Sequence, residues 1–362
     1  MGIKKALFLV PHRPGRSPGQ RFRFEQYLNL LRSNGFQCDI SYLINEKDDF
    51  NFYAPQKYIA KTLILFKSFA RRLKDLKRAG NYDLVFIYRE VHMLGITWFE
   101  RLLRRKGLKM ILDFDDSIWI NDTSDGNRHF SWLKRPMKTA EIVGLCDMVL
   151  VGNRFLAQWA LKYNSNVHVV PTTIDTERHV PVQKQVGQKI CIGWTGSSTT
   201  LKHLQMALPI LRELQQKYSR RVCFRVISNK PLLADLEGLE NISWNAETEV
   251  SDLRPIDIGI MPLPDDEWTR GKCGFKGLQY LALEIPAIMS PVGVNTEIIA
   301  DGVNGFLAKD HKEWVEKLSA LIESPDLRSR LGKAGRRTVV ERYSFNSQKD
   351  RYLQLFNSLF PP

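Results

Sequence analysis

The chain has 362 residues, of which 43% are apolar and 25% are charged. This composition excludes a disordered chain and is that of a globular protein, and the length predicts two domains or more. The formal net charge of +14 favours an anionic partner: a nucleotide, an acidic membrane surface or a nucleic acid.

The cysteines and the apolar runs bear on the compartment. The five cysteines are scattered and none lies in a CxxC pair, so we expect reduced thiols and no structural zinc. Residues 6–10 follow two lysines but are too few for the core of a signal peptide. No apolar run reaches the length of a membrane span, and we therefore expect a cytoplasmic protein.

The first part of the chain predicts the opening of a doubly wound α/β domain. Residues 3–10 and 38–44 are typical of strands, and residues 22–31 place apolar side chains at helical spacing between them. The connection at residues 11–20 is rich in Pro and Gly. Four arginines crowd this connection and the start of the helix: Arg13, Arg16, Arg21 and Arg23. We expect either a solvated basic loop or a site for an anion or an acceptor.

Residues 57–79 predict the most strongly amphipathic helix of the chain. They contain eight Lys and Arg against one Asp. The apolar side chains that share one face are Ile59, Leu63, Phe66, Phe69, Ala70, Leu73 and Leu76. A basic amphipathic helix is typical of binding to an anionic membrane surface. The alternative is a domain helix whose apolar face packs on the sheet and whose basic face is only solvated.

Acidic residues follow the end of another predicted strand. Residues 82–88 and 109–114 are both typical of strands, and the second runs into three carboxylates: Asp113, Asp115 and Asp116. Side chains at the carboxyl end of a parallel strand lie at the ligand edge of a doubly wound sheet. We therefore expect these carboxylates to lie at a ligand site. The alternatives are a metal site shared with His92 and N-capping of the next element.

A new α/β pattern starts in the second half of the chain. Residues 178–188 are polar, contain Pro and Gly and lack an apolar period, so they predict a linker. Residues 189–194 then predict a first strand. The loop after this strand consists of small residues: Thr195, Gly196, Ser197 and Ser198. Such a loop lets backbone and hydroxyl groups approach a phosphate, and the alternative is an ordinary capped turn.

Residues 256–297 predict a strand, a polar loop, a helix and a second strand. The strands fall at 256–263 and 286–291, and the helix at 275–283. The loop and the start of the helix contain glycines and cations: Arg270, Gly271, Lys272, Gly274 and Lys276. A helix N-terminus with these features is a suitable site for a phosphate. The alternative is an ordinary βαβ loop that happens to carry Lys and Gly.

This order of elements resembles the GT-B architecture, an α/β fold with two doubly wound Rossmann-like domains that face a central cleft. Four segments of the second half are similar to family 4 glycosyltransferases, which are retaining enzymes that use nucleotide sugars: 190–198 (ICIGWTGSS), 262–282, 286–293 (PAIMSPVG) and 297–307 (EIIADGVNGFL). Residues 169–175 (VVPTTID) resemble the family's strand before the hinge.

The resemblance implies four parts of the chain. Residues 1–177 would form an N-terminal, acceptor-side Rossmann-like domain, and residues 178–188 the linker. Residues 189–340 would form the C-terminal domain that binds the nucleotide sugar. Residues 341–362 would form a C-terminal helix that crosses back to the N-terminal domain.

The chain departs from the family at its acidic pair. The family's Glu-x7-Glu pair falls on Gly271 and Gln279, so neither carboxylate is present. Three acidic residues lie just upstream: Asp265, Asp266 and Glu267. The strand-end histidine of many relatives falls on Asp115 or Asp116. A subset of bacterial relatives resembles this variant, so the resemblance implies a divergent but active enzyme.

The resemblance implies roles for individual residues. Lys276, with the amides of residues 274–276 and 195–198, would hold a diphosphate, and Gln279 would bind ribose hydroxyls. Asp115 or Asp116 would face the anomeric carbon or position the acceptor hydroxyl. The implied donor-binding residues are Thr195, Gly196, Ser197, Ser198, Trp244, Arg270, Lys272, Gly274, Phe275, Lys276 and Gln279.

As a relative of this family, the chain would be a hexosyltransferase. It would move a sugar from a nucleoside diphosphate sugar of the UDP or GDP type to a glycan or lipid-linked acceptor, with retention, in surface polysaccharide or glycoconjugate synthesis. We expect no cofactor or metal besides the donor, because cations can stabilise the leaving diphosphate.

The resemblance and the charge pattern also bear on partners and location. We expect a cytoplasmic enzyme that is peripheral on the inner face of the membrane through residues 57–79. No nucleic-acid partner is expected, because no recognition motif accompanies the basic charge. The alternatives are a sugar-nucleotide epimerase of the same architecture and a non-catalytic protein that binds nucleotide sugars.

Overall fold

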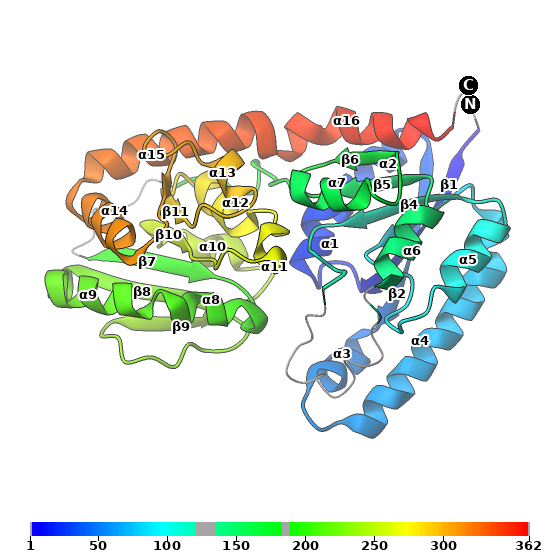
Figure 1. Cartoon of the computed structure of the whole chain (residues 1–362), viewed down its shortest axis with the longest axis horizontal. Helices are drawn as coiled ribbons and strands as arrows, with labels where there is room; N and C mark the ends of the chain where they lie inside the picture. The colour runs from blue at the N-terminus through cyan, green and yellow to red at the C-terminus, as the bar shows by residue number, and fades with distance from the viewer. Residues whose placement is uncertain (1, 121–134, 136, 183–188, 361–362) are drawn as a thin grey trace. The chain divides into compact units, whose positions relative to one another are not determined.

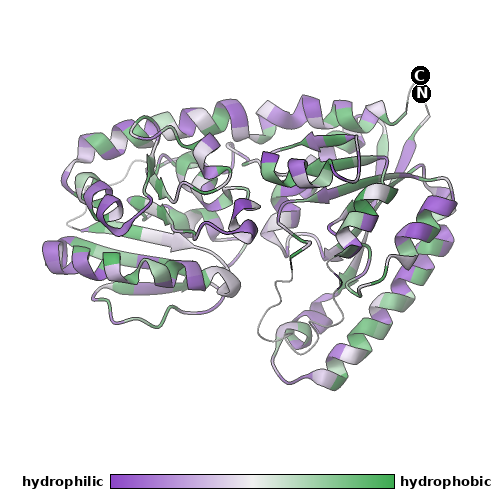
Figure 2. Ribbon diagram, in the orientation of Figure 1, coloured by the Kyte–Doolittle hydropathy of each residue, from purple (hydrophilic) through white to green (hydrophobic). Residues whose placement is uncertain are grey.

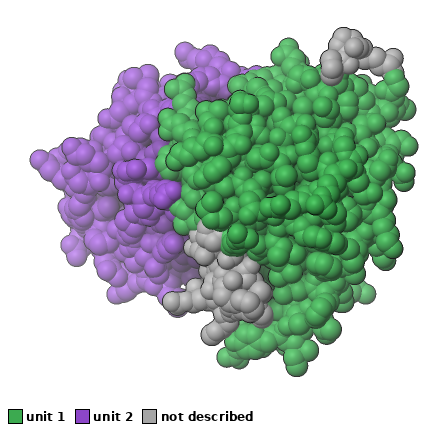
Figure 3. Space-filling view, turned by 45° about the vertical axis from the view of Figure 1, so that its right-hand side comes forward, with its two compact units in different colours: residues 1–171, 349–362 green, residues 172–348 purple. Residues whose placement is uncertain are grey.

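The computed structural model describes residues 2–120, 135, 137–182 and 189–360. The chain divides into two compact units, Met1–Pro171 with Lys349–Pro362 (unit 1) and Thr172–Gln348 (unit 2), which Figure 3 shows in different colours. In the described residues, each unit contains one six-stranded sheet whose paired strands are all parallel. The predicted α/β fold with two doubly wound domains is confirmed.

The sheet of unit 1 has the strand order β2-β1-β3-β4-β5-β6 (Figure 1). Its strands are β1 (Lys4–His12), β2 (Phe36–Ile44), β3 (Leu84–Tyr88), β4 (Lys109–Phe114), β5 (Met148–Val151) and β6 (Val167–Val169). Strands β3 and β5 are buried along their whole length, which explains their unbroken apolar sequences, because helices cover both faces of such a parallel sheet.

The described helices of unit 1 connect these strands. They are α1 (Pro18–Arg23), α2 (Leu28–Ser33), α3 (Glu46–Tyr53), α4 (Tyr58–Arg78), α5 (Trp98–Arg105), α6 (Met137–Leu145) and α7 (Arg154–Ala160). The single helix expected at residues 22–31 is instead α1, a 3₁₀ turn at Glu25–Tyr27 and α2. The break allows two neighbouring side chains to be buried: Arg23 pairs with Asp113, and the Phe24 ring stacks on Phe8 at 5.5 Å.

The sheet of unit 2 has the order β12-β11-β10-β7-β8-β9. Its strands are β7 (Ile190–Thr195), β8 (Val222–Ser228), β9 (Leu239–Ser243), β10 (Ile258–Met261), β11 (Ala287–Met289) and β12 (Phe306–Leu307). Its described α-helices are α8 (Leu201–Met206), α9 (Leu208–Tyr218), α10 (Glu249–Leu253), α11 (Glu267–Arg270), α12 (Phe275–Ala282), α13 (Asn295–Ile298), α14 (His311–Glu323) and α15 (Pro325–Thr338). A π-helix at Val339–Tyr343 leads into α16 (Phe345–Ser358).

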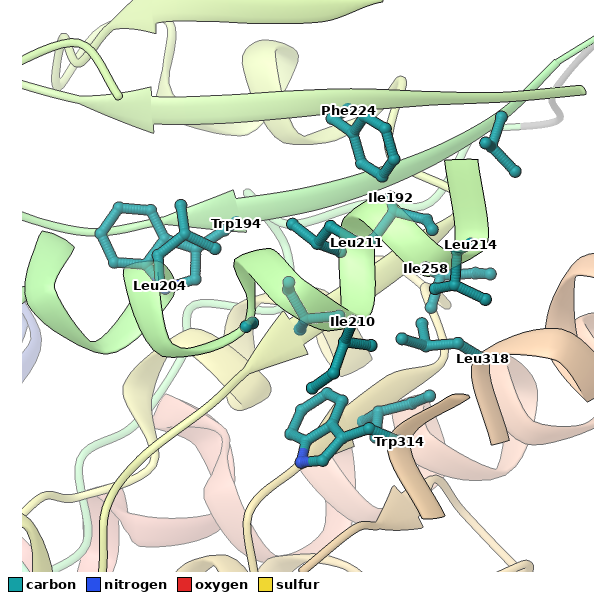
Figure 4. Packing of buried hydrophobic residues seen from close by; sticks show 14 of the residues in the cluster. Ile192, Trp194, Leu204, Ile210, Leu211, Leu214, Phe224, Ile258, Trp314 and Leu318 are labelled. Carbon is teal, nitrogen blue, oxygen red and sulfur yellow. The ribbon is translucent and has the colours of Figure 1, made fainter. Parts of the chain in front are cut away.

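Alternate residues of β10 face opposite sides of the sheet in unit 2. Ile258 and Ile260 belong to the core cluster that α9 and α14 cover (Figure 4). Gly259 faces α12, where an added Cβ would lie 2.3 Å from the ring of Tyr280. Because side chains of a strand alternate between the faces, this glycine is what allows the buried Tyr280 ring to lie directly on the strand.

The chain passes between the two units twice. The sequence pattern predicted the end of the first domain at residue 177, whereas the units divide after Pro171, and residues 183–188 of the expected linker lie outside the described residues. Helix α16 begins in unit 2, and its residues from Lys349 onward belong to unit 1. None of the helices in the described part of the chain combines the length and the apolar character that a bilayer crossing requires.

Candidate functional site

The loop after β7 lies at the carboxyl end of the sheet in unit 2, where doubly wound folds bind ligands. Three of its four amides donate hydrogen bonds to other groups of the unit: Thr195 N to Tyr280 Oη (2.9 Å), Gly196 N to Ile227 O (3.0 Å) and Ser198 N to Asn229 Oδ1 (2.7 Å). The loop is therefore rigid, and these amides, predicted to hold a diphosphate, already have partners. The hydroxyls of Ser197 and Thr199 lie 2.8 Å apart on its exposed side.

Helix α12 begins beside this loop. Its N-cap is Gly274, whose φ of 68° is in the left-handed region that favours glycine. Two contacts tie the helix to β7: the Tyr280 hydroxyl accepts the Thr195 amide, and Lys276 Nζ lies 5.6 Å from the centroid of the Trp194 ring. The structure therefore brings together the loop after β7 and the first turn of α12, as the sequence predicted.

A buried histidine lies near the cations of this region. His203 on α8 is only 4% exposed, and its Nε2 has no hydrogen-bond partner among the described residues. Burial, with the positive charges of Lys276, Lys202 and Lys272, lowers the pKa of His203 to about 4. The imidazole is therefore neutral at pH 7. We call Lys202, His203, Lys272 and Lys276 the basic cluster.

Sequence reasoning missed two members of the basic cluster. It singled out Lys272 and Lys276 but not Lys202 or His203, which follow the loop after β7 by four and five residues. Their signal was an adjacent Lys-His pair at the start of α8, just beyond that loop. Tyr280, which joins α12 to the loop, was missed as well.

Gln279 and Gly271 occupy the two positions where the resemblance would place glutamates. Gln279 is 1% exposed, and its Nε2 has no hydrogen-bond partner among the described residues. A buried amide donor without a partner costs free energy, so a ligand acceptor at this point would be stabilised. Gly271 contributes no side chain.

Two of the three acidic residues upstream of α12 have partners within the same segment. Asp266 is the N-cap of α11, where its carboxylate accepts the Thr269 amide at 2.8 Å. Asp265 accepts from Arg270 Nε at 2.6 Å in an ion pair that is about half exposed on both sides. Arg270 is thus partly neutralised by a neighbour.

Trp244, the remaining predicted donor-binding residue, follows the edge strand β9, two strands from β7. Its indole Nε1 donates to Glu249 Oε1 at 3.3 Å, which orients the ring. Helix α12 instead connects β10 and β11, on the opposite side of β7 in the strand order. The structure therefore does not group Trp244 with the predicted residues of α12.

In unit 1, Asp115 and Asp116 share one arginine. Arg89 donates to Asp115 Oδ1 at 2.8 Å and to Asp116 Oδ2 at 2.6 Å, and Tyr88 Oη donates to Asp115 Oδ1 at 2.8 Å. Burial alone would raise the pKa of Asp115, but the positive charges of Arg89 and Arg23 and these hydrogen bonds lower it. Asp115 is therefore a fixed negative charge at the end of β4.

Asp113 is fully buried and pairs with a different arginine. It forms a bidentate pair with Arg23, with Nε–Oδ1 and Nη2–Oδ2 distances of 3.0 and 2.8 Å. Arg23 also donates to the carbonyl of Val170. Asp113 and Arg23 thus link α1, β4 and the end of β6. This is a structural role, and the sequence had named Asp113 only as a possible metal ligand beside Asp115 and Asp116.

The other members of the predicted anion and metal sites also have neighbours. Asp49 on α3 accepts from Arg13 at 2.9 Å and from Arg16. His92 is buried, with Nε2 2.8 Å from Ser68 Oγ and Nδ1 3.2 Å from the Leu94 amide. Within the described ranges, no group of three or more His, Cys, Asp or Glu side chains is placed to hold a metal ion.

Comparisons with known proteins identify the segment that contains α12. Residues 269–338 match the family described as Glycosyl transferases group 1. A trehalose synthase from Thermococcus litoralis is 35% identical over 75 residues, which are 21% of this chain and 18% of that protein. The matched region therefore spans less than a fifth of the length of that relative.

Solved structures match the whole fold. A sucrose-phosphate synthase from Thermosynechococcus elongatus has a TM-score of 0.74 at 13% identity, covering 99% of both chains. Anabaena HepE, in complex with UDP and glucose, has a TM-score of 0.64 at 12% identity, covering 98% of this chain and 100% of that chain. The chain thus has the GT-B fold of these solved structures, and its residues 269–338 are similar to the Glycosyl transferases group 1 family.

Proposed function

We propose that this protein is a glycosyltransferase that moves a sugar from a nucleoside diphosphate sugar to a glycan or lipid-linked acceptor. The observation that carries the proposal is the basic cluster: three lysines lie near enough to His203 to lower its pKa, and one of them, Lys276 in the first turn of α12, lies over Trp194 of β7. A leaving nucleoside diphosphate gains negative charge as the glycosidic bond breaks. Lysines and helix N–H groups stabilise that charge.

The donor would bind to unit 2 in a defined orientation. Lys276, Lys272 and the first amides of α12 contact the diphosphate. Gln279 binds a ribose hydroxyl through the amide that lacks a partner among the described residues. Because the amides of Thr195, Gly196 and Ser198 are engaged, the exposed Ser197 hydroxyl is the better contact in that loop. HepE, a structural neighbour, is recorded with UDP and glucose, so UDP-sugars are the first donors to test.

The acceptor side belongs to unit 1. Asp115 is negative and oriented by Arg89 and Tyr88, so it suits the positioning of an acceptor hydroxyl or the stabilisation of positive charge at the anomeric carbon. Asp116 shares Arg89 and assists. We infer retention of configuration by front-face attack, from the resemblance to family 4 enzymes. The lysines neutralise the diphosphate, so we expect transfer to proceed in the presence of a chelator.

We place the enzyme in the cytoplasm, peripheral on the inner face of the membrane, in surface polysaccharide or glycoconjugate synthesis. The basic helix expected at residues 57–79 supports that location. An acceptor carried on a lipid would be presented at the same surface.

The first test is a screen of UDP- and GDP-sugars with the full chain. Thermal unfolding reports binding, because a ligand that binds only the folded state raises its stability by mass action. Release of the free nucleoside diphosphate reports turnover, measured with and without chelator and with glycan or lipid-linked acceptors. If no donor shifts the melting temperature and none is turned over, the proposal is wrong.

The absence of both family glutamates favours a second candidate, a protein that binds nucleotide sugars without transferring them. Gly271 and Gln279 stand at those positions. Such a protein would show the thermal shift, yet long incubation would release less than one equivalent of nucleoside diphosphate. A free epimerised nucleotide sugar as product would instead identify an epimerase.

A further inference from the structure

Helix α4 of unit 1 turns a polar stripe toward the protein. The buried residues of the helix are Lys61, Ile64, Ser68, Arg72 and Asp75, spaced by three or four positions and so on one face. A helix that packs on the sheet through its apolar face was one of the two alternatives that the sequence left open. That alternative is wrong for the first half of the helix, where the packed face is mostly polar.

Hydrogen bonds fix this rotation of the helix. Arg72 donates to the backbone carbonyls of Val91 (2.6 Å), Val10 (2.9 Å) and Ser41 (3.1 Å), and to the Asp75 carboxylate (2.9 Å). Asp75 in turn accepts from the Ser41 hydroxyl at 2.6 Å. Turning α4 about its axis would break these buried bonds, each of which is costly to leave unmade.

The opposite face of α4 therefore exposes apolar side chains. Ile59, Leu63 and Phe66 are 80%, 55% and 70% exposed, and Phe50 on the neighbouring α3 is 77% exposed. We call these four residues the apolar patch. Figure 2 marks hydrophobic positions along this helix, whose place in unit 1 Figure 1 shows. Farther along, Phe69 packs against Phe99 with ring centroids 5.0 Å apart, so the exposure is concentrated in the first half of α4.

Positive charge predominates among the exposed residues of the segment that carries the apolar patch. Six cations of residues 46–78 are exposed, against Glu46 as the one exposed acid in that range: Lys47, Lys57, Lys67, Lys74, Lys77 and Arg78. Lys74 and Lys77 continue the same helix face beyond Phe66, at spacings of eight and eleven residues. The other acids of this range, Asp48, Asp49 and Asp75, are at most partly exposed, and two of these cations, Lys67 and Arg78, pair with Asp48 and Asp75.

We propose that the apolar patch and the lysines of α4 form a docking surface for an anionic lipid bilayer. The apolar side chains enter the boundary between headgroups and acyl chains, and the lysines contact anionic headgroups. Charge selects this occupant over a second copy of the chain, because self-association through this face would bring two basic surfaces together. The inference deepens the peripheral location proposed above and does not depend on catalysis.

The test is co-sedimentation of the full chain with vesicles of phosphatidylcholine alone or mixed with phosphatidylglycerol. The wild-type protein should bind the mixed vesicles at low salt, bind the neutral vesicles weakly, and dissociate as salt rises. Lys67→Gln with Lys74→Gln and Lys77→Gln should weaken binding by about fivefold per lysine. Ile59→Ser with Leu63→Ser and Phe66→Ser should weaken it by at least about tenfold.

Matched controls alter similar side chains elsewhere. Leu233→Ser removes an 88% exposed leucine from unit 2, and Lys312→Gln removes a lysine whose side chain is 83% exposed on α14. Both should bind vesicles as the wild type does. Because every substituted side chain is largely exposed, circular dichroism and thermal unfolding should confirm that all variants fold.

Three results would overturn the proposal. The first is a wild-type protein that ignores anionic vesicles at low salt. The second is an apolar-patch variant that binds as tightly as the wild type. The third is a concentration-dependent dimer that the apolar-patch variant abolishes, which would make this face an interface between copies. Donor binding, measured without vesicles by thermal shift, tests the proposed function separately, and these substitutions should leave it unchanged.

Discussion

Aromatic rings restrict the positions of the two lysines near the start of α12. Lys276 lies over Trp194 at 5.6 Å, and its positive charge contributes to lowering the pKa of His203. Lys272 lies 4.6 Å from the centroid of the Trp268 ring. Each aromatic ring restricts a flexible side chain through a cation–π contact, which orders the cations before a ligand arrives.

Replacing Lys276 by Ala should reduce sugar transfer by about ten- to a hundredfold in kcat/KM, because it removes a charge-assisted hydrogen bond worth about 1.5–3 kcal/mol. Lys276→Arg keeps the charge and should recover part of the loss. Lys312→Ala, on exposed α14, is the control. Equal kcat/KM for the Ala variant and the wild type would remove Lys276 from the donor site.

The buried His203 predicts a pH dependence of stability. Its pKa is about 4 in the folded protein, against an ordinary value of 6.5 for a solvated imidazole, so between these values the unfolded state binds the extra proton. Stability therefore rises with pH in this window. The contribution of the neutral His203 to stability is fully present above about pH 6.5 and is lost as the pH drops toward 4, by about 3 kcal/mol at most.

Urea unfolding at a series of pH values from about 4.5 to about 7.5 measures how the free energy of unfolding changes with pH. His203→Gln should flatten the slope relative to the wild type. His12 and His92 also have lowered pKa values, of about 4 and about 3. The variant should therefore keep the part of the pH dependence that these two histidines cause. An unchanged slope in His203→Gln would contradict a buried neutral imidazole at this position.

At the scale of helices and strands, sequence patterns predicted elements better than orientations. The prolines and glycines around β10, α12 and β11 marked their bounds, and the first turn of α12 lies beside the loop after β7 as expected. For α4 the pattern predicted the helix but did not decide which face is buried. Hydrophobicity alone would bury the apolar face, whereas the actual rotation depends on bonds from Arg72 to strand carbonyls distant in sequence.

The same limit applies to the candidate site. Lys272 and Lys276 were recognisable because they lie in one loop and helix with glycines. His203 belongs to the site only because the fold brings it close enough to Lys276 and Lys272 for their charges to lower its pKa, and Asp113 is held in a buried pair with Arg23. Such pairings depend on tertiary packing, which local spacing does not encode.

Arg72→Met should lower the free energy of unfolding by about 3–5 kcal/mol, because it breaks a buried ion pair and leaves strand carbonyls without a donor. Lys74→Met, on the exposed face of the same helix, should change it by less than about 0.5 kcal/mol. Urea denaturation of both variants makes the comparison. A mild effect of Arg72→Met would mean that these bonds do not fix the rotation of α4.

Gly274→Ala tests how α12 is positioned. Alanine at a φ of 68° is strained by about 1–2 kcal/mol, and its Cβ would lie 2.2 Å from Ile298 Cδ1, so the first turn of α12 should shift. Gly107→Ala has a similar φ of 74° with nothing within 4 Å, and it isolates the strain. We expect Gly274→Ala to be the less stable variant and alone to raise the KM for the donor.

At the scale of the whole molecule, the chain is two doubly wound units joined in sequence twice. Each unit has its own sheet and core, so the charge pattern and chemistry divide between them: the basic cluster in unit 2, and Asp115, Asp116 and the apolar patch in unit 1. The C-terminal segment is the exception, because α16 starts in unit 2 and its residues from Lys349 onward belong to unit 1.

Aromatic side chains hold that last segment to unit 1. Tyr352 stacks on Tyr27 with ring centroids 4.0 Å apart, and Phe356 packs edge-on to Phe36 and stacks on Phe86 at 5.8 and 6.0 Å. The side chains of Tyr352 and Phe356 are both fully buried. The core of unit 1 is therefore completed by residues that follow the whole of unit 2 in the sequence.

Phe356→Ala should destabilise unit 1 by about 3–5 kcal/mol, because it leaves a cavity among packed rings. Gln354→Ala, exposed on the same helix, is the control and should have little effect. Hydrogen exchange followed by mass spectrometry should locate the loss: β1 and β3 of unit 1 exchange faster, whereas β7 and β10 of unit 2 keep their protection. A UDP-sugar should still raise the stability of unit 2 in this variant, since the basic cluster is intact. Uniform loss of protection in both sheets would show instead that the two units unfold as one cooperative body.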